Sequence, residues 1–81
     1  MQITIEYYAV LADRTGERSV VRTVPQGATV RTVVNELIRE HEIVDSLQDA
    51  LAIAVNDVWK PMDQPLQDGD VLALIPPVSG G

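Results

Sequence analysis

The residues with the clearest chemical potential in this 81-residue chain are its last six, Pro76-Pro77-Val78-Ser79-Gly80-Gly81. They follow an apolar segment, 71–75, that has the composition of a buried strand. Proline fixes φ and has no backbone N–H, so the two prolines predict the end of that strand and a stiff start to the tail. Glycine has no side chain, and a tail ending in two glycines fits a channel too narrow for other residues. The tail therefore predicts that Gly81 presents its α-carboxylate to the active site of another protein.

The chemistry open to a terminal carboxylate is narrow. Its pKa is usually about 3.3–3.7, so the group is ionised and poorly electrophilic at neutral pH. Activation as an acyl-adenylate by an ATP-using partner makes its carbonyl carbon reactive. Capture by sulfide or persulfide then gives a thiocarboxylate, and capture by an amine gives an amide. The first product defines a sulfur carrier and the second a protein modifier.

The other polar residues do not build a self-contained active site. The chain has no cysteine and a single histidine, His41, which excludes a cysteine nucleophile and a metal site rich in histidine. His41 is expected near the end of the main helix, where an imidazolium interacts favourably with the helix dipole. Asp63, Asp68 and Asp70 lack the spacing of a calcium loop, and turn chemistry explains the last two. We expect no bound cofactor or metal, and we expect ATP to be used by the activating partner.

Composition and charge narrow the possible partners. The formal net charge is −6, from 12 acidic and 6 basic residues. An acidic surface repels phosphate backbones and is attracted to basic proteins, so nucleic acid is excluded as a partner. No apolar run approaches the roughly 20 residues that cross a bilayer, and no signal-like segment opens the sequence. We therefore expect a single cytoplasmic domain that does not bind membranes.

The rest of the sequence predicts an α+β fold. Alternating or apolar runs predict strands at 2–8, 19–24, 51–55 and 71–75, with a short one at 58–60. Thr29 is suited to cap a helix, and the apolar spacing that follows predicts one main helix to about Glu40. This order of elements predicts a mixed sheet with the main helix packed on one face.

Connections between these elements are also marked in the sequence. Segment 9–18 predicts a loop with one helical turn, hinged at Gly16, so that the first two strands form a hairpin. Segment 43–51 suggests a short second helix. Asn56-Asp57 and Asp68-Gly69-Asp70 predict tight turns before the last two strands.

Two strands carry more apolar residues than one helix can cover. Segments 51–55 and 71–75 are apolar at every position, although only alternate side chains face the main helix. Loops or the second helix would cover the remaining side chains if they belonged to the core. An exposed apolar patch would instead mark a protein interface. We predict the interface, and we assign Leu72, Leu74 and Ile75 to it because they lead directly into the tail.

The sequence resembles a known family, the small subunits of molybdopterin synthase. The resemblance covers essentially the whole chain and is strongest over 54–81. Its motifs are Tyr8-Ala9-Val10-Leu11 with Gly16, Ala54-Val55-Asn56, Pro65-Leu66, Asp68-Gly69-Asp70 and the terminal Pro76-Pro77-Val78-Ser79-Gly80-Gly81. The chain departs from the family in the first loop, where Ala12 precedes Asp13 in place of an arginine beside an acidic residue.

The resemblance implies a β-grasp, ubiquitin-like fold, with residues 1–81 as one sulfur-carrier domain and 76–81 as its exposed tail. It implies that Gly81 is adenylated by an enzyme of the ubiquitin-E1-like type and converted to a thiocarboxylate. Pro76, Pro77, Val78, Ser79 and Gly80 would then insert into the large subunit of a heterotetramer. There the chain, itself without catalytic side chains, would give sulfur to cyclic pyranopterin monophosphate to form the molybdopterin dithiolene.

Three alternatives remain open on sequence grounds. The chain can be a sulfur carrier for thiamine, cysteine or tRNA thiolation, although thiamine carriers are usually shorter and lack the two prolines. It can be a ubiquitin-like modifier conjugated to lysines of other proteins through Gly81. A purely structural interaction domain is the third.

Overall fold

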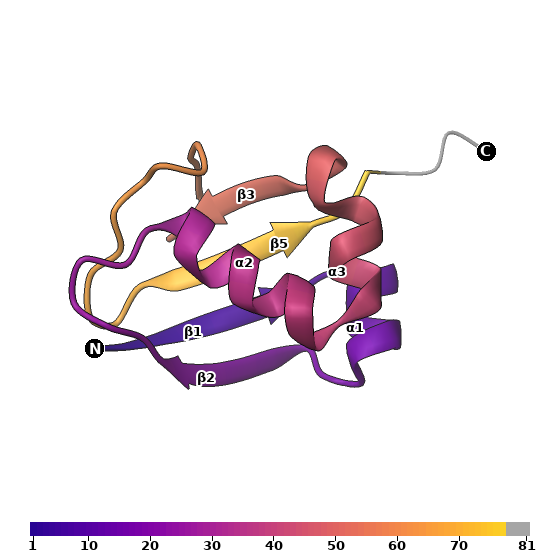
Figure 1. Cartoon of the computed structure of the whole chain (residues 1–81), viewed down its shortest axis with the longest axis horizontal. Helices are drawn as coiled ribbons and strands as arrows, with labels where there is room; N and C mark the ends of the chain where they lie inside the picture. The colour runs from indigo at the N-terminus through magenta and orange to yellow at the C-terminus, as the bar shows by residue number, and fades with distance from the viewer. Residues whose placement is uncertain (78–81) are drawn as a thin grey trace.

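A five-stranded sheet with helices on one face forms the domain, and the computed structural model describes residues 1–77 of it (Figure 1). The elements are β1 (Gln2–Tyr7), α1 (Val10–Thr15), β2 (Ser19–Thr23), α2 (Val30–Glu40), α3 (Glu42–Leu47), the 3₁₀ turn η1 (Gln48–Ala50), β3 (Ala52–Val55), β4 (Val58–Trp59) and β5 (Val71–Ile75). The predicted strands, main helix and short second helix are all present. The predicted α+β architecture is therefore confirmed.

The last strand of the chain lies at the centre of the sheet. The strand order is β2-β1-β5-β3-β4, with β5 parallel to β1 and antiparallel to β3. In this register Tyr7 lies opposite Leu74, so β1 and β5 end side by side. The N-terminus and the end of β5 lie at opposite ends of the domain (Figure 1). The sheet topology thus fixes the point from which the tail leaves.

The main helix starts where the sequence predicts. The Thr29 hydroxyl accepts the N–H of Thr32 at 3.3 Å, and the Thr32 hydroxyl accepts the N–H of Thr29 at 3.1 Å, forming a capping box. From this cap, α2 turns one stripe of side chains into the core: Val30, Val33, Val34 and Leu37. The apolar spacing and the cap together explain both the start of α2 and its orientation.

The core lies between α2 and the facing side of the sheet. The sheet contributes alternate side chains to it: Ile3, Ile5, Tyr7, Ile53, Val55, Leu72 and Leu74. Leu72 and Leu74 are completely buried, so their assignment to an exposed partner interface is wrong. Strand alternation turns these two residues toward α2 and turns Ile75 to the opposite face.

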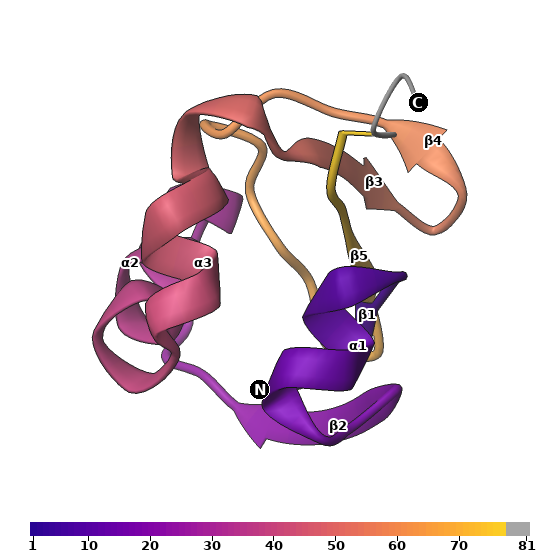
Figure 2. The same ribbon diagram turned by 90° about the vertical axis from the view of Figure 1, so that its right-hand side faces the viewer.

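Shorter elements close the end of the domain where the tail leaves. The predicted helical turn of the first loop is α1, and Gly16 ends it in a left-handed conformation with φ of 79°. Figure 2 looks at this end and shows α1 and α3 across it. None of the helices within residues 1–77 has the length and apolar content needed to cross a membrane.

Candidate functional site at the root of the tail

The exposed segment begins one residue later than the sequence predicts. β5 ends at Ile75, after which Pro76 is buried and Pro77 is exposed. Pro76 stands two residues beyond Leu74, so strand alternation directs it to the covered side of the sheet. Pro76 therefore belongs to the body of the domain, which corrects the prediction that the tail starts there. The predictions for Val78, Ser79, Gly80 and Gly81 concern residues outside those that the structure describes.

The end of β1 forms one side of the tail root. The Tyr8 N–H donates to the carbonyl oxygen of Leu74 at 3.3 Å, and the Tyr8 side chain is 46% exposed. Ala9 follows with φ of 52° and ψ of −126°, which is an unusual conformation for a residue with a Cβ. The Leu11 N–H donates to the Tyr8 carbonyl at 3.1 Å and closes this turn. A strained turn thus holds an exposed aromatic ring beside β5.

The face of the sheet opposite α2, here called the open face, carries small apolar side chains next to β5. On this face Ala73 lies opposite Ala54, and Ala54 lies opposite Trp59 on the edge strand β4. The two alanines are each 7% exposed, whereas Trp59 is 67% exposed. Figure 2 shows β4 at the edge of the sheet, beside β3. The open face is therefore a floor of small residues with a large indole standing at one border.

Sequence reasoning predicted an apolar patch on this face but assigned the wrong residues to it. Of the three predicted interface residues, only Ile75 points to the open side, and it lies opposite Ala52. Trp59 was missed because a two-residue strand after a turn gives almost no periodicity to read. Its size and its position in a hairpin were the only available signals.

Acidic side chains lie on the other side of the tail root, next to β1 and α1. A shallow hollow between β1 and α1 is lined by Glu6, Tyr8, Asp13, Glu17 and Arg18, among others. Three carboxylates and one guanidinium, that of Arg18, line this hollow, and within residues 1–77 the only ion pairs are those of Arg22 with Glu36 and Glu40. The charge next to the tail root is therefore negative, as expected for a surface that meets a basic partner.

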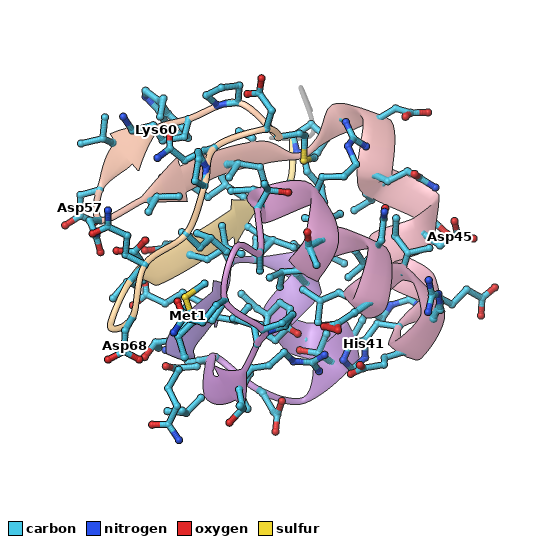
Figure 3. All side chains as sticks on the ribbon, turned by 60° about the vertical axis from the view of Figure 1, so that its left-hand side comes forward. Met1, His41, Asp45, Asp57, Lys60 and Asp68 are labelled. Carbon is cyan, nitrogen blue, oxygen red and sulfur yellow. The ribbon has the colours of Figure 1, made fainter. Side chains whose placement is uncertain are left out.

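The remaining polar residues have structural positions. His41 ends α2, where its N–H donates to the Leu37 carbonyl at 2.8 Å and its ring meets the Tyr7 ring edge-on at 5.9 Å. The Asp68 carboxylate accepts the Gln2 N–H at 2.7 Å, which ties the turn to β1. Figure 3 shows His41 well apart from Asp68. No group of three acidic or histidine side chains suited to a metal occurs in the described part of the chain.

A β-grasp sheet with a helix across one face, whose central strand leads into a diglycine tail, defines a ubiquitin-like domain of the carrier type. The model of the ThiS family matches residues 5–81. The chain is 32% identical to the molybdopterin synthase sulfur carrier subunit of Chlamydomonas reinhardtii, over 100% of both chains. It is 31% identical to the human subunit of the same name, over 99% of this chain and 94% of that one. The chain belongs to the ThiS family, among the molybdopterin synthase sulfur carrier subunits.

Solved structures confirm the β-grasp fold. A putative molybdopterin converting factor subunit 1 from Pyrococcus furiosus matches with a TM-score of 0.86 and 30% identity, covering 96% of this chain and 99% of that one. SAMP1 from Haloferax volcanii matches with a TM-score of 0.86 and 30% identity over 100% of both chains. A complex of subunits 1 and 2 of molybdopterin-converting factor from Helicobacter pylori matches with a TM-score of 0.70 and 26% identity, again over 100% of both chains.

Proposed function

We propose that this chain is the sulfur carrier subunit of a molybdopterin synthase. Its Gly81 is adenylated, becomes a thiocarboxylate, and gives its sulfur to cyclic pyranopterin monophosphate to form the dithiolene. The observation that carries the proposal is the match over the full chain to sulfur carrier subunits. The position of β5 supports it, because the central strand of the sheet runs directly into the diglycine tail.

The chain's contribution to this chemistry is its terminal acyl group. A carboxylate oxygen of Gly81 attacks the α-phosphorus of ATP, pyrophosphate leaves, and the resulting mixed anhydride has a reactive carbonyl carbon. A sulfur nucleophile then attacks that carbon and AMP leaves, which places sulfur at the terminus. The dithiolene needs two sulfur atoms, so the carrier must dissociate and be charged again between transfers. ATP for the activation is available in the cytoplasm, where we place the chain.

Two partners follow from this cycle: an adenylating enzyme of the ubiquitin-E1-like type, and a large subunit that accepts the tail. The Helicobacter pylori complex contains a protein similar to this chain bound to a second subunit, which supports the second partner. We place the large subunit on the open face of the sheet. Ile75 and Pro77 connect that face to the tail, so a protein that takes the tail lies across it.

Trp59 is the expected anchor of this interface. Exposed tryptophans contribute disproportionately to binding when a partner's pocket excludes water from them, and the alanine floor beside Trp59 allows close approach. Trp59→Ala should weaken binding of the large subunit about tenfold or more, which corresponds to at least about 1.4 kcal/mol. Val21→Ala is the matched control, because Val21 is 61% exposed at the opposite edge of the same face.

Isothermal titration of the two variants with the large subunit, together with their melting temperatures, tests this interface. Equal affinities for Trp59→Ala and the wild-type chain would place the large subunit elsewhere. Lost affinity with an unchanged melting temperature supports the proposed face.

The function itself is tested at the terminus. The intact mass of the chain isolated from its own host should exceed the sequence mass by the difference between sulfur and oxygen. A chain lacking Gly81 should fold normally, since the last strand ends at Ile75 and the described core uses residues up to Pro76, and it should not support molybdopterin formation with its partners. Dithiolene formation by the truncated chain would refute the proposal.

One observation favours a second candidate function, that of a protein modifier. SAMP1 from Haloferax volcanii, the small archaeal modifier protein 1, matches over its whole length, and a second crystal structure of it matches with 28% identity and a TM-score of 0.83. A modifier would be recovered from its host as conjugates to lysines of other proteins, with no sulfur at Gly81. The same mass measurement therefore separates the two candidates. Carriers for thiamine, cysteine or tRNA thiolation would carry the sulfur but would fail with the large subunit and its pterin substrate.

A further inference from the structure

One aspartate of the chain, Asp68, is followed by a glycine, and no asparagine is. In an aspartate–glycine pair the glycine nitrogen can attack the carboxyl carbon of the aspartate, because glycine has no side chain to obstruct the approach. The product is a cyclic imide. Its hydrolysis gives either aspartate or isoaspartate, in which the backbone runs through the side chain. The sequence thus contains one position, Asp68–Gly69, that is especially prone to this spontaneous reaction.

The structure holds both reacting groups of this pair on a single residue, Gln2. The Gln2 N–H donates to the Asp68 carboxylate at 2.7 Å, and the Gln2 carbonyl accepts the Gly69 N–H at 2.7 Å. Gln2 is free to make both bonds because Met1 exchanges its backbone hydrogen bonds with Val24. In an antiparallel ladder the next residue then turns its backbone groups away from the partner strand.

The turn that contains the pair is exposed but well defined. The Asp70 N–H donates to the Gln67 carbonyl at 3.1 Å, and the Asp70 carboxylate accepts the Gln67 N–H at 2.8 Å. Between them Asp68 and Gly69 are exposed, and Gly69 has φ of 87°, which only glycine adopts without strain. Figure 3 shows Asp68 near Met1, at the end of the domain where the chain begins. Water therefore reaches the pair, and the bonds to Gln2 restrain it.

We infer that Asp68–Gly69 is the site at which this chain undergoes spontaneous backbone isomerisation, and that Gln2 controls the rate by holding both reacting groups. An amide nitrogen becomes a nucleophile only after it loses its proton. An amide that donates a hydrogen bond in the folded protein loses its proton only when that bond opens. The Gly69 nitrogen is thus unreactive while it is bonded to Gln2, and the Asp68 carboxyl is held by the same residue. This role of Gln2 is independent of the proposed function.

The reaction needs only water and its ions. The Gly69 nitrogen gives its proton to a solvent base and attacks the Asp68 Cγ. A carboxyl oxygen, protonated from solvent, leaves as water, and the imide is closed. Water then adds to the former backbone carbonyl carbon of Asp68, and the bond from that carbon to the Gly69 nitrogen breaks. Gly69 remains attached through Cγ, and the mass of the chain is unchanged because one water leaves and one returns.

Isomerisation at this turn affects the strand that leads to the tail. Isoaspartate adds a methylene to the backbone just before β5, which starts at Val71. The Asp70 carbonyl accepts the Thr4 N–H at 2.9 Å, and Thr4 lies opposite Val71 in the β1–β5 ladder. A longer backbone link displaces Asp70 from this position, so the modified chain should unfold at a lower temperature than the original.

The rate of isoaspartate formation tests the role of Gln2. The folded full chain is incubated at neutral pH below its melting temperature, samples are labelled by an isoaspartyl methyltransferase, and peptide mapping locates the label. Gln2→Pro removes the N–H that holds Asp68 but no bond of the β1–β2 ladder, and we expect roughly fivefold faster labelling. Gln2→Ala keeps both backbone groups and should match the wild-type chain. Asp68→Glu keeps the charge and should abolish the label.

The wild-type chain alone provides a second measurement. In concentrated guanidinium its isomerisation should be about tenfold faster or more, because both bonds to Gln2 are then broken. Equal rates in the folded and unfolded chain would overturn the inference even if Gln2→Pro failed to fold. Equal rates for folded Gln2→Pro and Gln2→Ala would also overturn the role of Gln2. Label that maps mainly to another aspartate would refute the assignment of the site.

Discussion

Asn56 forms two hydrogen bonds with Val71, one through its backbone and one through its side chain. The Asn56 N–H donates to the Val71 carbonyl at 2.9 Å, and the Asn56 Oδ1 accepts the Val71 N–H at 2.9 Å. The Nδ2 of the same side chain donates to Asp70 at 2.9 Å. Asn56 also has φ of 51°, which asparagine tolerates better than most residues. One residue therefore fixes the hairpin turn and the start of the central strand β5.

Replacing this residue should destabilise the domain. Asn56→Ala leaves the Val71 N–H without its acceptor. It also puts alanine, which cannot form the side-chain hydrogen bonds of asparagine, at a positive φ. We therefore expect the free energy of unfolding to fall by about 2 kcal/mol. Asp57→Gly is the control in the same turn, because Asp57 has φ of 68° and glycine suits that position. It should leave stability unchanged or raise it. Urea unfolding of both variants checks the prediction, which fails if Asn56→Ala unfolds at the wild-type midpoint.

The turn after β1 stores strain that glycine should release. Ala9 combines positive φ with a Cβ, so Ala9→Gly should raise the free energy of unfolding by roughly 1 kcal/mol. Ala12 offers a matched control inside α1, where the same change should lower stability by roughly 1 kcal/mol. Chemical denaturation measures both. A loss of stability in Ala9→Gly would show that the alanine side chain contributes packing that outweighs the strain.

Two neighbouring residues of β5 should separate folding from binding. Leu74 is fully buried, so Leu74→Ala should cost about 2–5 kcal/mol of stability. Ile75 is only partly buried and faces the open side, so Ile75→Ala should cost less stability and should weaken binding of the large subunit. Melting temperatures and titrations of the two variants give the comparison. The interpretation of the open face is wrong if Ile75→Ala binds the large subunit as tightly as the wild-type chain.

The ion pair between Arg22 on β2 and Glu40 on α2 should make the stability of the domain depend on pH. The Arg22 guanidinium donates to both oxygens of Glu40, and this hydrogen bonding holds the pKa of the Glu40 carboxyl below its usual value of 4.5. A carboxyl whose pKa is lower in the folded state adds stability above its unfolded pKa and loses that contribution as the pH falls through its folded pKa. Because both side chains are partly exposed, the contribution should be at most about 1 kcal/mol.

Urea unfolding at neutral pH and in mild acid tests this contribution. Glu40→Gln should be less stable than the wild-type chain at neutral pH, and the difference should shrink in acid. Glu17→Gln is the control, because the Glu17 carboxylate makes no ion pair within residues 1–77. If the difference in unfolding free energy between Glu40→Gln and the wild-type chain does not change with pH, the ion pair does not contribute to stability in this way.

The architecture could be predicted from the sequence because its signals are local. The cap at Thr29 and the apolar spacing after it define α2, and the Asn56-Asp57 pair defines a turn that requires positive φ. The choice of buried face in β5 was different. All five residues of 71–75 are apolar, so composition cannot tell which alternate set faces the helix, and Leu72 and Leu74 were assigned to the wrong side. Only the register with β1 and β3 decides the question.

The candidate site was predictable in its chemistry and less so in its surroundings. The diglycine tail identifies the reactive group because no other residue of the chain offers comparable chemistry. The burial of Pro76 and the exposure of Trp59 depend on contacts between segments far apart in the sequence, which a reading of neighbours along the chain does not reveal.

The central position of β5 has a consequence for folding during synthesis on the ribosome. The strand that joins the two halves of the sheet is synthesised after all the other strands described here, so β1 and β3 have no common neighbour until β5 has been made. A prematurely terminated product would lack both the middle of the sheet and the acyl terminus. The arrangement couples completion of the sheet to synthesis of the segment that leads to Gly81, so a chain truncated before β5 can neither form this sheet nor be charged at Gly81.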